Sequence, residues 1–395
     1  MRNALATCCL LVGFTACNEA DKGGQLPQVS ISLPTDAPAL TRDEWIDVRI
    51  RITDETGNRE FSSPYLSVQG RGHSTFDKPK KPYNLKLDRE RSILGLPARK
   101  KFALLAGFFD HALIRTALAQ EVARQTSLAA TTPQGRFVSL RVEGGEQGIY
   151  YLCEKVADMV NEETLMFELD SYAINEGGTS FHTAELQLPI TVKQPKKLPT
   201  SLLSEMERIV NEAEADPAQH VDFDTFADYF LVQELCMNAE PNGPRSCFMH
   251  LLPDGRIAAG PVWDFDLAFI SVNVDEKDDL RPLRLSHLDG LRTLTPDSLY
   301  NANALWYGRL LQDSSFVSHL KDRWQTLKPR FEGLTACIDS LDQLIRPQAI
   351  TDQQMWNHLE PARFDSCTTY ESAIATLRSI YTERIQKLDG LVKGL

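Results

Sequence analysis

The chain has 395 residues, of which 42% are hydrophobic and 24% charged, and its formal net charge is −12 at pH 7. This composition is typical of a globular protein that is long enough for two domains. The acidic balance argues against nucleic acid as a partner, although it leaves room for a local basic pocket.

The first residues have the pattern of an export signal. Arg2 precedes an apolar run from Ala4 to Phe14 that is too short to cross a bilayer as a helix. Small residues then lead into Cys17, a pattern that resembles the lipobox of bacterial lipoproteins, in which the cysteine is lipidated after cleavage. An ordinary signal peptide cleaved near the same place is the alternative. We therefore predict a lipoprotein signal at residues 1–17, a flexible tether at residues 18–28, and a lipid-anchored membrane protein in the bacterial periplasm or at the cell surface.

Residues 29–200 mostly show strand patterns. Ile46, Val48, Ile50 and Ile52 alternate with polar residues, as in a half-buried strand. Related patterns occur at residues 29–33, 65–68, 83–88, 138–142 and 149–156, whereas residues 113–122 have helical spacing. We predict a lobe of mainly antiparallel sheet with one helix across it.

Helical spacing dominates residues 201–395. Helices are predicted at residues 202–210 and 223–231, and again through most of the chain beyond a polar loop at residues 287–295. A short hairpin is predicted at residues 248–262. The predicted class is therefore α+β, with a β-rich N-terminal lobe at residues 29–200 and a helical C-terminal lobe at residues 201–395 that carries the hairpin.

The cysteines give no metal signature. The sequence contains no CxxC pair and no Cys/His spacing typical of zinc. Cys337 and Cys367 lie in the predicted helical tail, where they are either bridged in an oxidising compartment or free and buried.

The most informative segment runs from Gly260 to Phe269 and sets two carboxylates into an apolar stretch. In an extended strand, Asp264 and Asp266 would lie on one face while Phe265 turns into the core. Two like charges on one face of an apolar segment are unfavourable unless a cation joins them, and Mg²⁺ or Mn²⁺ with oxygen ligands fits best. The alternative is a solvated turn at the end of a strand.

Residues 70–86 concentrate positive charge in an otherwise acidic chain. Their cations are Arg71, Lys78, Lys80, Lys81 and Lys86. Such a segment could hold phosphate, but the GxxxxGK[ST] and GxGxxG nucleotide fingerprints are absent, and a solvated basic loop is the alternative. Lys86 is the strongest candidate because it lies within a predicted strand and faces a defined side.

Three further polar residues could complete a site for phosphoryl transfer. Glu154 lies within a predicted strand and either points to water or pairs with Lys86, as a lysine pairs with a glutamate in protein kinases. Asn238 and Glu240 follow a predicted helix. The acid, with the amide nearby, could serve there as the base for a substrate hydroxyl and could also help to bind a metal. Alternatively, both residues could have the ordinary roles of polar residues at a helix end.

A series of motifs runs in this order between about residue 65 and about residue 270: Gly70-Arg71-Gly72, Pro79-Lys80-Lys81-Pro82-Tyr83, Leu94-Gly95-Leu96-Pro97, Lys101-Phe102-Ala103-Leu104-Leu105, Asp110-His111-Ala112-Leu113-Ile114-Arg115, Gly148-Ile149-Tyr150, Glu154-Lys155-Val156, Tyr229-Phe230, Asn238 and Pro261-Val262-Trp263-Asp264-Phe265-Asp266. Together these motifs resemble the spore-coat-protein-H (CotH) family of atypical protein kinases. Each motif alone is weak, but so many in the right order are specific.

The resemblance implies a divergent kinase-like fold that uses ATP and a divalent metal, Mg²⁺ or Mn²⁺, to phosphorylate Ser or Thr in a protein substrate. It implies that Asp264 binds the metal with the assistance of Asp266. By the same resemblance, Arg71 and Lys86 would face the phosphates and Glu154 would orient the lysine.

The chain departs from the family pattern at three positions. Glu240 stands where an aspartate is frequent, Ile270 where a glycine is common, and His73 where an asparagine is often found. ATP is also scarce outside the cytoplasm. These points support an alternative from another class, a catalytically weak or inactive kinase-like binding module at the cell envelope. A metal-dependent phosphohydrolase that uses the same acids is a third hypothesis.

Overall fold

The computed structural model describes residues 25–395 with the exception of residues 73–74, 176, 271, 274–292, 295–296 and 357–366. Cys17, the predicted signal and most of the predicted tether lie outside the described residues, as do His73 and most of the predicted polar loop at residues 287–295.

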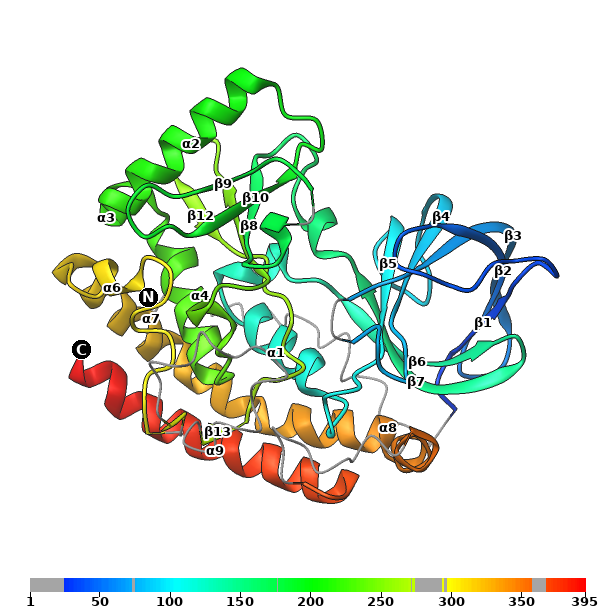
Figure 1. Cartoon of the computed structure of the whole chain (residues 1–395). Coiled ribbons are helices and arrows are strands. Elements are labelled where there is room, and N and C mark those ends of the chain that lie inside the picture. The colour runs from blue at the N-terminus through cyan, green and yellow to red at the C-terminus, as the bar shows by residue number, and fades with distance from the viewer. Residues whose placement is uncertain are drawn as a thin grey trace, which may run out of the picture.

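The N-terminal strands form a closed seven-stranded barrel, seen at the right of Figure 1, in the order β1-β2-β3-β4-β5-β7-β6. Its strands are β1 (Gln28–Ser32), β2 (Ile46–Thr53), β3 (Arg59–Gly70), β4 (Tyr83–Arg91), β5 (Arg99–Leu105), β6 (Gly135–Val142) and β7 (Gly145–Glu154). Neighbouring strands are antiparallel except β1 and β6, whose parallel pairing closes the barrel with Val29 opposite Leu140. Closure leaves the barrel without a free sheet edge.

Strict alternation in the sequence accounts for the barrel interior. In β2, the residues Ile46, Val48, Ile50 and Ile52 are buried and the residues between them are exposed. Leu85, Phe102 and Leu152 extend the same apolar interior across β4, β5 and β7. Part of the outer face of β5 and β7 is also apolar, and through Ala103 and Tyr151 it joins the core that includes α1 (Arg115–Arg124).

A second, five-stranded sheet lies beside the barrel, with the order β12-β11-β8-β10-β9. Its strands are β8 (Met166–Leu169), β9 (Ser180–His182), β10 (Pro189–Gln194), β11 (Cys247–Leu251) and β12 (Ile257–Ala259). β8 pairs with β11, with Phe167 opposite Met249, so this sheet takes strands from both sides of residue 200. A short pair, β13 (Val272–Asn273) and β14 (Thr293–Leu294), forms a separate ribbon.

Helices fill the rest of the chain. After α1 these are α2 (Thr200–Ala215), α3 (Pro217–His220), α4 (Phe223–Leu235), α6 (Tyr307–Leu310), α7 (Ser314–Gly333), α8 (Thr335–Trp356) and α9 (Tyr370–Gly394). Short 3₁₀ turns are η1 (Ser127–Thr131), η2 (Val156–Met159), η3 (Ala173–Asn175) and η4 (Glu240–Asn242). The long helices α7, α8 and α9 pack on one another, α7 and α9 also pack on α4, and α8 reaches β7 of the barrel (Figure 1).

This architecture corrects the predicted fold. We expected a kinase-like fold with a β-rich N-terminal lobe and a helical C-terminal lobe. That prediction is wrong, because the chain instead combines a closed barrel, a second sheet and a helical region. The cause is that strand alternation shows which residues face a core, whereas barrel closure depends on a pairing between β1 and β6 that no local pattern encodes.

The cysteine alternatives are decided within the described residues. Cys337 and Cys367 are both buried thiols, so the bridge between them does not form in this structure. Among the described residues, no helix combines the length and the apolar composition that crossing a membrane requires.

Candidate functional site

A cavity of about 1060 Å³ is lined by residues of the barrel, of the second sheet and of the segment after β12. Four of the predicted site residues line it: Arg71, Glu240, Asp264 and Asp266. Its wall also holds charged residues that the sequence analysis did not single out: Lys155, Glu168, Asp170, Lys193 and Arg245.

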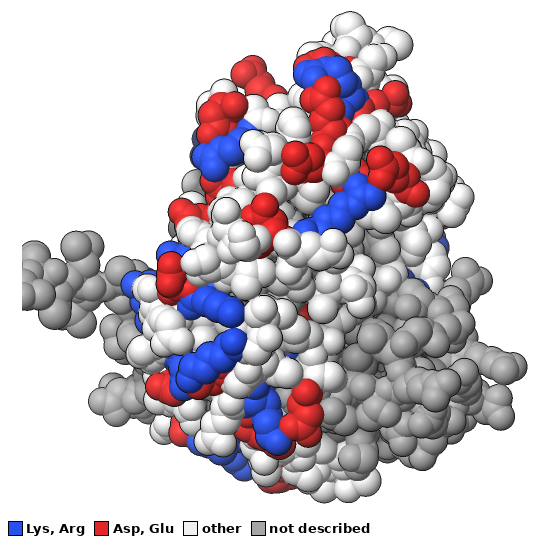
Figure 2. Space-filling view, turned by 90° about the vertical axis from the view of Figure 1, so that its left-hand side faces the viewer, with Lys and Arg blue, Asp and Glu red and all other residues white. Residues whose placement is uncertain are grey.

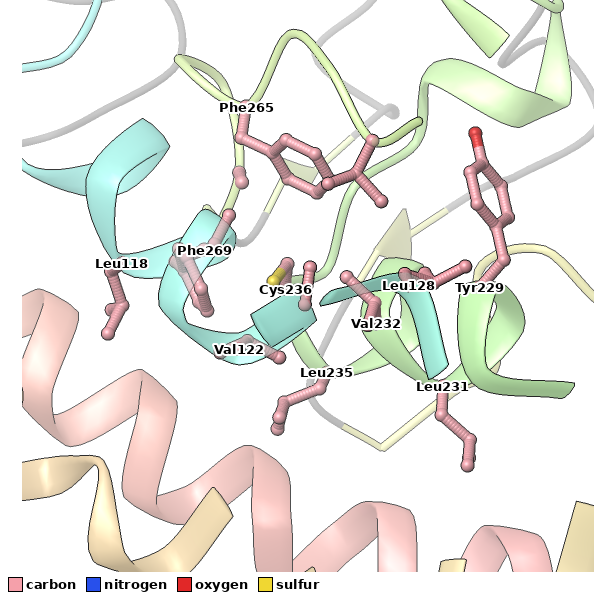
Figure 3. Close-up of a cluster of buried hydrophobic side chains, with 14 of the residues drawn as sticks. Leu118, Val122, Leu128, Tyr229, Leu231, Val232, Leu235, Cys236, Phe265 and Phe269 are labelled. Carbon is pink, nitrogen blue, oxygen red and sulfur yellow. The ribbon is translucent and has the colours of Figure 1, made fainter. Parts of the chain in front are cut away.

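Apolar anchors fix the segment that carries the two aspartates. Figure 3 shows Phe265 and Phe269 directed into a cluster of side chains from α1 and α4, which also includes Val122 of α1 and Cys236, the residue that follows α4. The Phe269 N–H also donates to the Cys236 carbonyl oxygen at 2.6 Å. The prediction that Phe265 turns into the core is confirmed, because its side chain is buried.

The predicted strand through the aspartates is wrong. β12 ends at Ala259, so Asp264 and Asp266 follow the hairpin in irregular backbone. Asp264 has a φ of 64°, in the left-handed region that aspartate and asparagine tolerate better than most residues. The turn still brings both carboxylates to the cavity.

The acids of the cavity oppose one another's ionisation. Burial raises the pKa of Asp264, although Arg71 acts against the increase. Burial, and then the charge of Asp264, raise the pKa of Asp266 well above its ordinary value. Burial and Asp264 likewise raise the pKa of Glu240 to about 8. Such mutual repulsion on a cavity wall favours the binding of a cation.

The raised pKa of Glu240 predicts that the metal-free protein loses stability as the pH rises from about 5 to about 8. In that range the native state keeps a proton that the unfolded state has released, so deprotonation favours unfolding. Glu240→Gln should make the free energy of unfolding less dependent on pH, by an amount that corresponds to the uptake of up to about one proton. Urea unfolding in a chelator at several pH values measures this, with the exposed Glu162→Gln as control. An unchanged slope in Glu240→Gln would contradict the raised pKa.

Asn238 connects the two acidic segments. Its side-chain oxygen accepts from the Glu240 N–H at 3.3 Å, and its amide nitrogen donates to the Asp264 carbonyl oxygen at 3.5 Å. The Asn301 side chain in turn donates to the Asn238 carbonyl oxygen at 3.0 Å. Asn238 is buried, so it orients both segments from behind the cavity. Glu240 Oε2 has no hydrogen-bond partner among the described residues.

Arg71 brings positive charge to the same cavity. Its guanidinium lies 5.4 Å from the ring centroid of Trp263, next to the aspartates in sequence. Burial lowers the pKa of Arg71, and the charges of Asp264 and Asp266 are among the groups that oppose this decrease. The cavity therefore places an arginine within electrostatic reach of both aspartates.

The structure does not bring Lys86 and Glu154 together. Leu85 pairs with Phe102, which pairs with Glu154, and this row faces the barrel interior. Lys86 belongs to the next row and faces outward, where its ammonium lies 5.6 Å from the ring centroid of Trp45. Neither Lys86 nor Glu154 lines the cavity.

Glu154 has other partners. Its Oε1 accepts from Nε of Arg99 at 2.8 Å and its Oε2 accepts from the Gln134 N–H at 2.9 Å. These contacts satisfy the carboxylate at the end of β7. They give Glu154 a structural role at one end of the barrel.

Two carboxylates, Glu168 in β8 and Asp170 directly after it, were not predicted from the sequence. Glu168 pairs with Lys193, and burial raises the pKa of Glu168 to about 7 although Lys193 opposes the increase. Asp170 accepts backbone N–H groups from Tyr172 at 2.7 Å and from Ser246 at 3.2 Å. The signal was present in the sequence, because two acids alternate in the buried stretch Met-Phe-Glu-Leu-Asp as they do after β12.

The donor set fits a hydrated divalent cation better than a closed metal cage. No group of three or more His, Cys, Asp or Glu side chains forms a complete site within the part of the chain that the structure describes. Mg²⁺ commonly uses one or two carboxylates and completes its shell with water and substrate phosphate. Asp264 and Asp266 supply such carboxylates, and the unpartnered oxygen of Glu240 is a third oxygen on the same cavity.

Comparison with known proteins shows which family this sequence matches. A family model described as CotH kinase protein matches residues 68–388. No curated protein matches the chain.

Proposed function

Because this chain belongs to the CotH kinase protein family, we propose that it transfers the γ-phosphate of ATP to Ser or Thr of a protein substrate, with Mg²⁺ or Mn²⁺ as cofactor. The observation that carries the proposal is the cavity on which the charge of Asp264 helps to raise the pKa values of Asp266 and Glu240 beside Arg71. Carboxylates that repel one another favour a bound cation, and an arginine beside them favours a phosphate, so this arrangement suits a cation and a phosphate that bind together.

Different residues of the chain would bind the cation and the phosphate groups. Asp264 and Asp266 hold the cation, and Arg71 and Lys155, which line the same cavity, attract phosphate oxygens. The metal–nucleotide, when bound, supplies the phosphoryl group and offsets its negative charge.

Glu240 is suited to accept a proton. Its raised pKa makes it a stronger base than an ordinary glutamate, and its Oε2 has no hydrogen-bond partner among the described residues. Asn238 positions both acids through the hydrogen bonds that hold their backbones. Glu154 is left out of this proposal because its oxygens are engaged by Arg99 and Gln134. We further propose that lipidation of Cys17 holds this activity at the bacterial envelope.

Nucleotide-dependent stabilisation tests the proposal. Millimolar ATP with Mg²⁺ or Mn²⁺ should raise the unfolding midpoint of the wild-type chain, since a ligand at 100 times its Kd adds about 2.7 kcal/mol. Asp264→Asn should remove most of the shift, and ATP with a chelator should give little.

Three outcomes separate the hypotheses. No shift with either metal would overturn the kinase proposal and favour the binding module. A shift accompanied by phosphate release without a protein acceptor would favour the phosphohydrolase. A shift that persists in Asp264→Asn would remove Asp264 from the site.

A further inference from the structure

Charges of both signs are interspersed on one face of this acidic protein. On the face shown in Figure 2, blue and red side chains are interspersed. Ion pairs on α2 illustrate the pattern, because Arg208 pairs with both Glu205 and Glu212 at 2.6 Å. Such neutralised surfaces offer little to a charged ligand.

The outside of the barrel differs, because it carries a row of lysines. Lys86 of β4 lies directly opposite Lys101 of β5. Phe102 lies opposite Glu154, so the next position of the same register sets Lys155 beside Lys101. Residues opposite each other share a face, and like charges there are unfavourable without an anion. We call Lys86, Lys101 and Lys155 the lysine row.

A fourth cation joins the row from the second sheet. Lys196 follows β10 and is exposed. Burial and then the Lys196 ammonium lower the pKa of Lys101, and Lys86 adds to the decrease. Burial lowers the pKa of Lys155 to about 8, and Lys101 and Lys196 contribute. Asp158 acts in the opposite direction on both Lys101 and Lys155, but one acid does not balance this cluster.

The lysine row leads to the cavity. Lys155 lines the cavity with Arg71, whereas Lys86 and Lys101 lie outside it. Adjacent strands are about 4.8 Å apart, so the row spans roughly 10 Å across three strands. Alternate residues of an extended peptide are about 7 Å apart, so two alternating carboxylates fit within the length of the row. A single phosphate would instead need donors converging on one point.

We propose that the lysine row and Lys196 bind acidic residues that flank the acceptor Ser or Thr, so that the substrates are hydroxyl residues within Asp/Glu-rich segments. This inference rests on the proposed function, because it supplies the acceptor to the same cavity. The peptide lies extended across β4, β5 and β7, and its hydroxyl reaches the cavity past Lys155.

Binding of a labelled peptide tests the inference without nucleotide. The peptide carries one Ser followed by alternating Glu, and fluorescence anisotropy measures its Kd. Lys86→Glu/Lys101→Glu should weaken binding about tenfold or more, and added salt should weaken wild-type binding. The single variant Lys196→Glu, at an exposed residue, gives a second measurement in case the double variant does not fold. Lys321→Glu on α7 changes the net charge by the same amount per site and should leave Kd unchanged.

Each outcome has a clear meaning. A Lys-rich peptide that binds as tightly as the acidic peptide would overturn the inference. An unchanged Kd for the acidic peptide in both Lys86→Glu/Lys101→Glu and Lys196→Glu would also overturn it. Anionic vesicles that bind the row while the acidic peptide does not would also overturn it and identify a lipid surface instead.

In transfer assays, the variants should raise KM for the acidic peptide with kcat preserved. Lysine-dependent peptide binding without phosphate transfer would contradict the proposed function alone. Transfer with equal KM for acidic and basic peptides would contradict this inference alone.

Discussion

Asp264→Asn should lower the rate of phosphate transfer from ATP by at least about 10²-fold while leaving the folded protein at least as stable. The aspartate faces the cavity, is among the groups that oppose the lowered pKa of Arg71, and is the main charge that raises the pKa of Asp266. Removing its charge removes a ligand for the cation. It also relieves the repulsion between neighbouring acids in the metal-free protein, so unfolding should not become easier.

Asparagine is the informative replacement at this position. The φ of 64° at Asp264 suits asparagine, whereas alanine would add backbone strain. Asp254→Asn, at the exposed tip of the β11–β12 hairpin, is the matched control and should keep wild-type activity. Full transfer activity in Asp264→Asn would contradict the assignment, as would a large loss in Asp254→Asn.

The second large effect is on stability. Lys80→Met should destabilise the protein by about 3–5 kcal/mol, because it removes the ammonium that pairs with the buried carboxylate of Asp352. Lys80 Nζ lies 2.9 and 2.7 Å from the two carboxylate oxygens of Asp352, and both side chains are 0% exposed. Asp352 Oδ2 also accepts the Ile149 N–H at 2.7 Å. The pair thus connects the barrel to α8.

Urea unfolding of matched variants measures this effect. Lys80→Met/Asp352→Asn should recover much of the loss, because it removes both charges and keeps an oxygen for Ile149. Arg208→Met, at an exposed pair on α2, should cost much less than Lys80→Met. Equal losses for Lys80→Met and Arg208→Met would contradict the account of the buried pair.

Local patterns in the sequence predicted individual strands and the burial of Phe265, because alternation and apolar runs report burial directly. They did not predict the barrel. Its closure depends on Val29 facing Leu140, and either strand alone fits an open sheet equally well. The second sheet was missed for the same reason, since β8 and β11 meet only in the folded chain.

The candidate site was predicted where the chemistry was local. Asp264 and Asp266 stand out as charges within an apolar run, and the structure places both on the cavity. The pairing of Lys86 with Glu154 required knowing which face of the barrel each strand presents. Tyr150, Leu152 and Glu154 alternate toward the interior, which sequence alone cannot distinguish from the outer face.

The most direct test of the central claim is to identify the product formed by the wild-type chain from γ-labelled ATP, Mg²⁺ or Mn²⁺, and a Ser-containing acidic peptide. The account predicts label on the peptide hydroxyl, located by mass spectrometry, and none with Asp264→Asn. Label found only as free phosphate, or no ATP consumption with either metal, would contradict it.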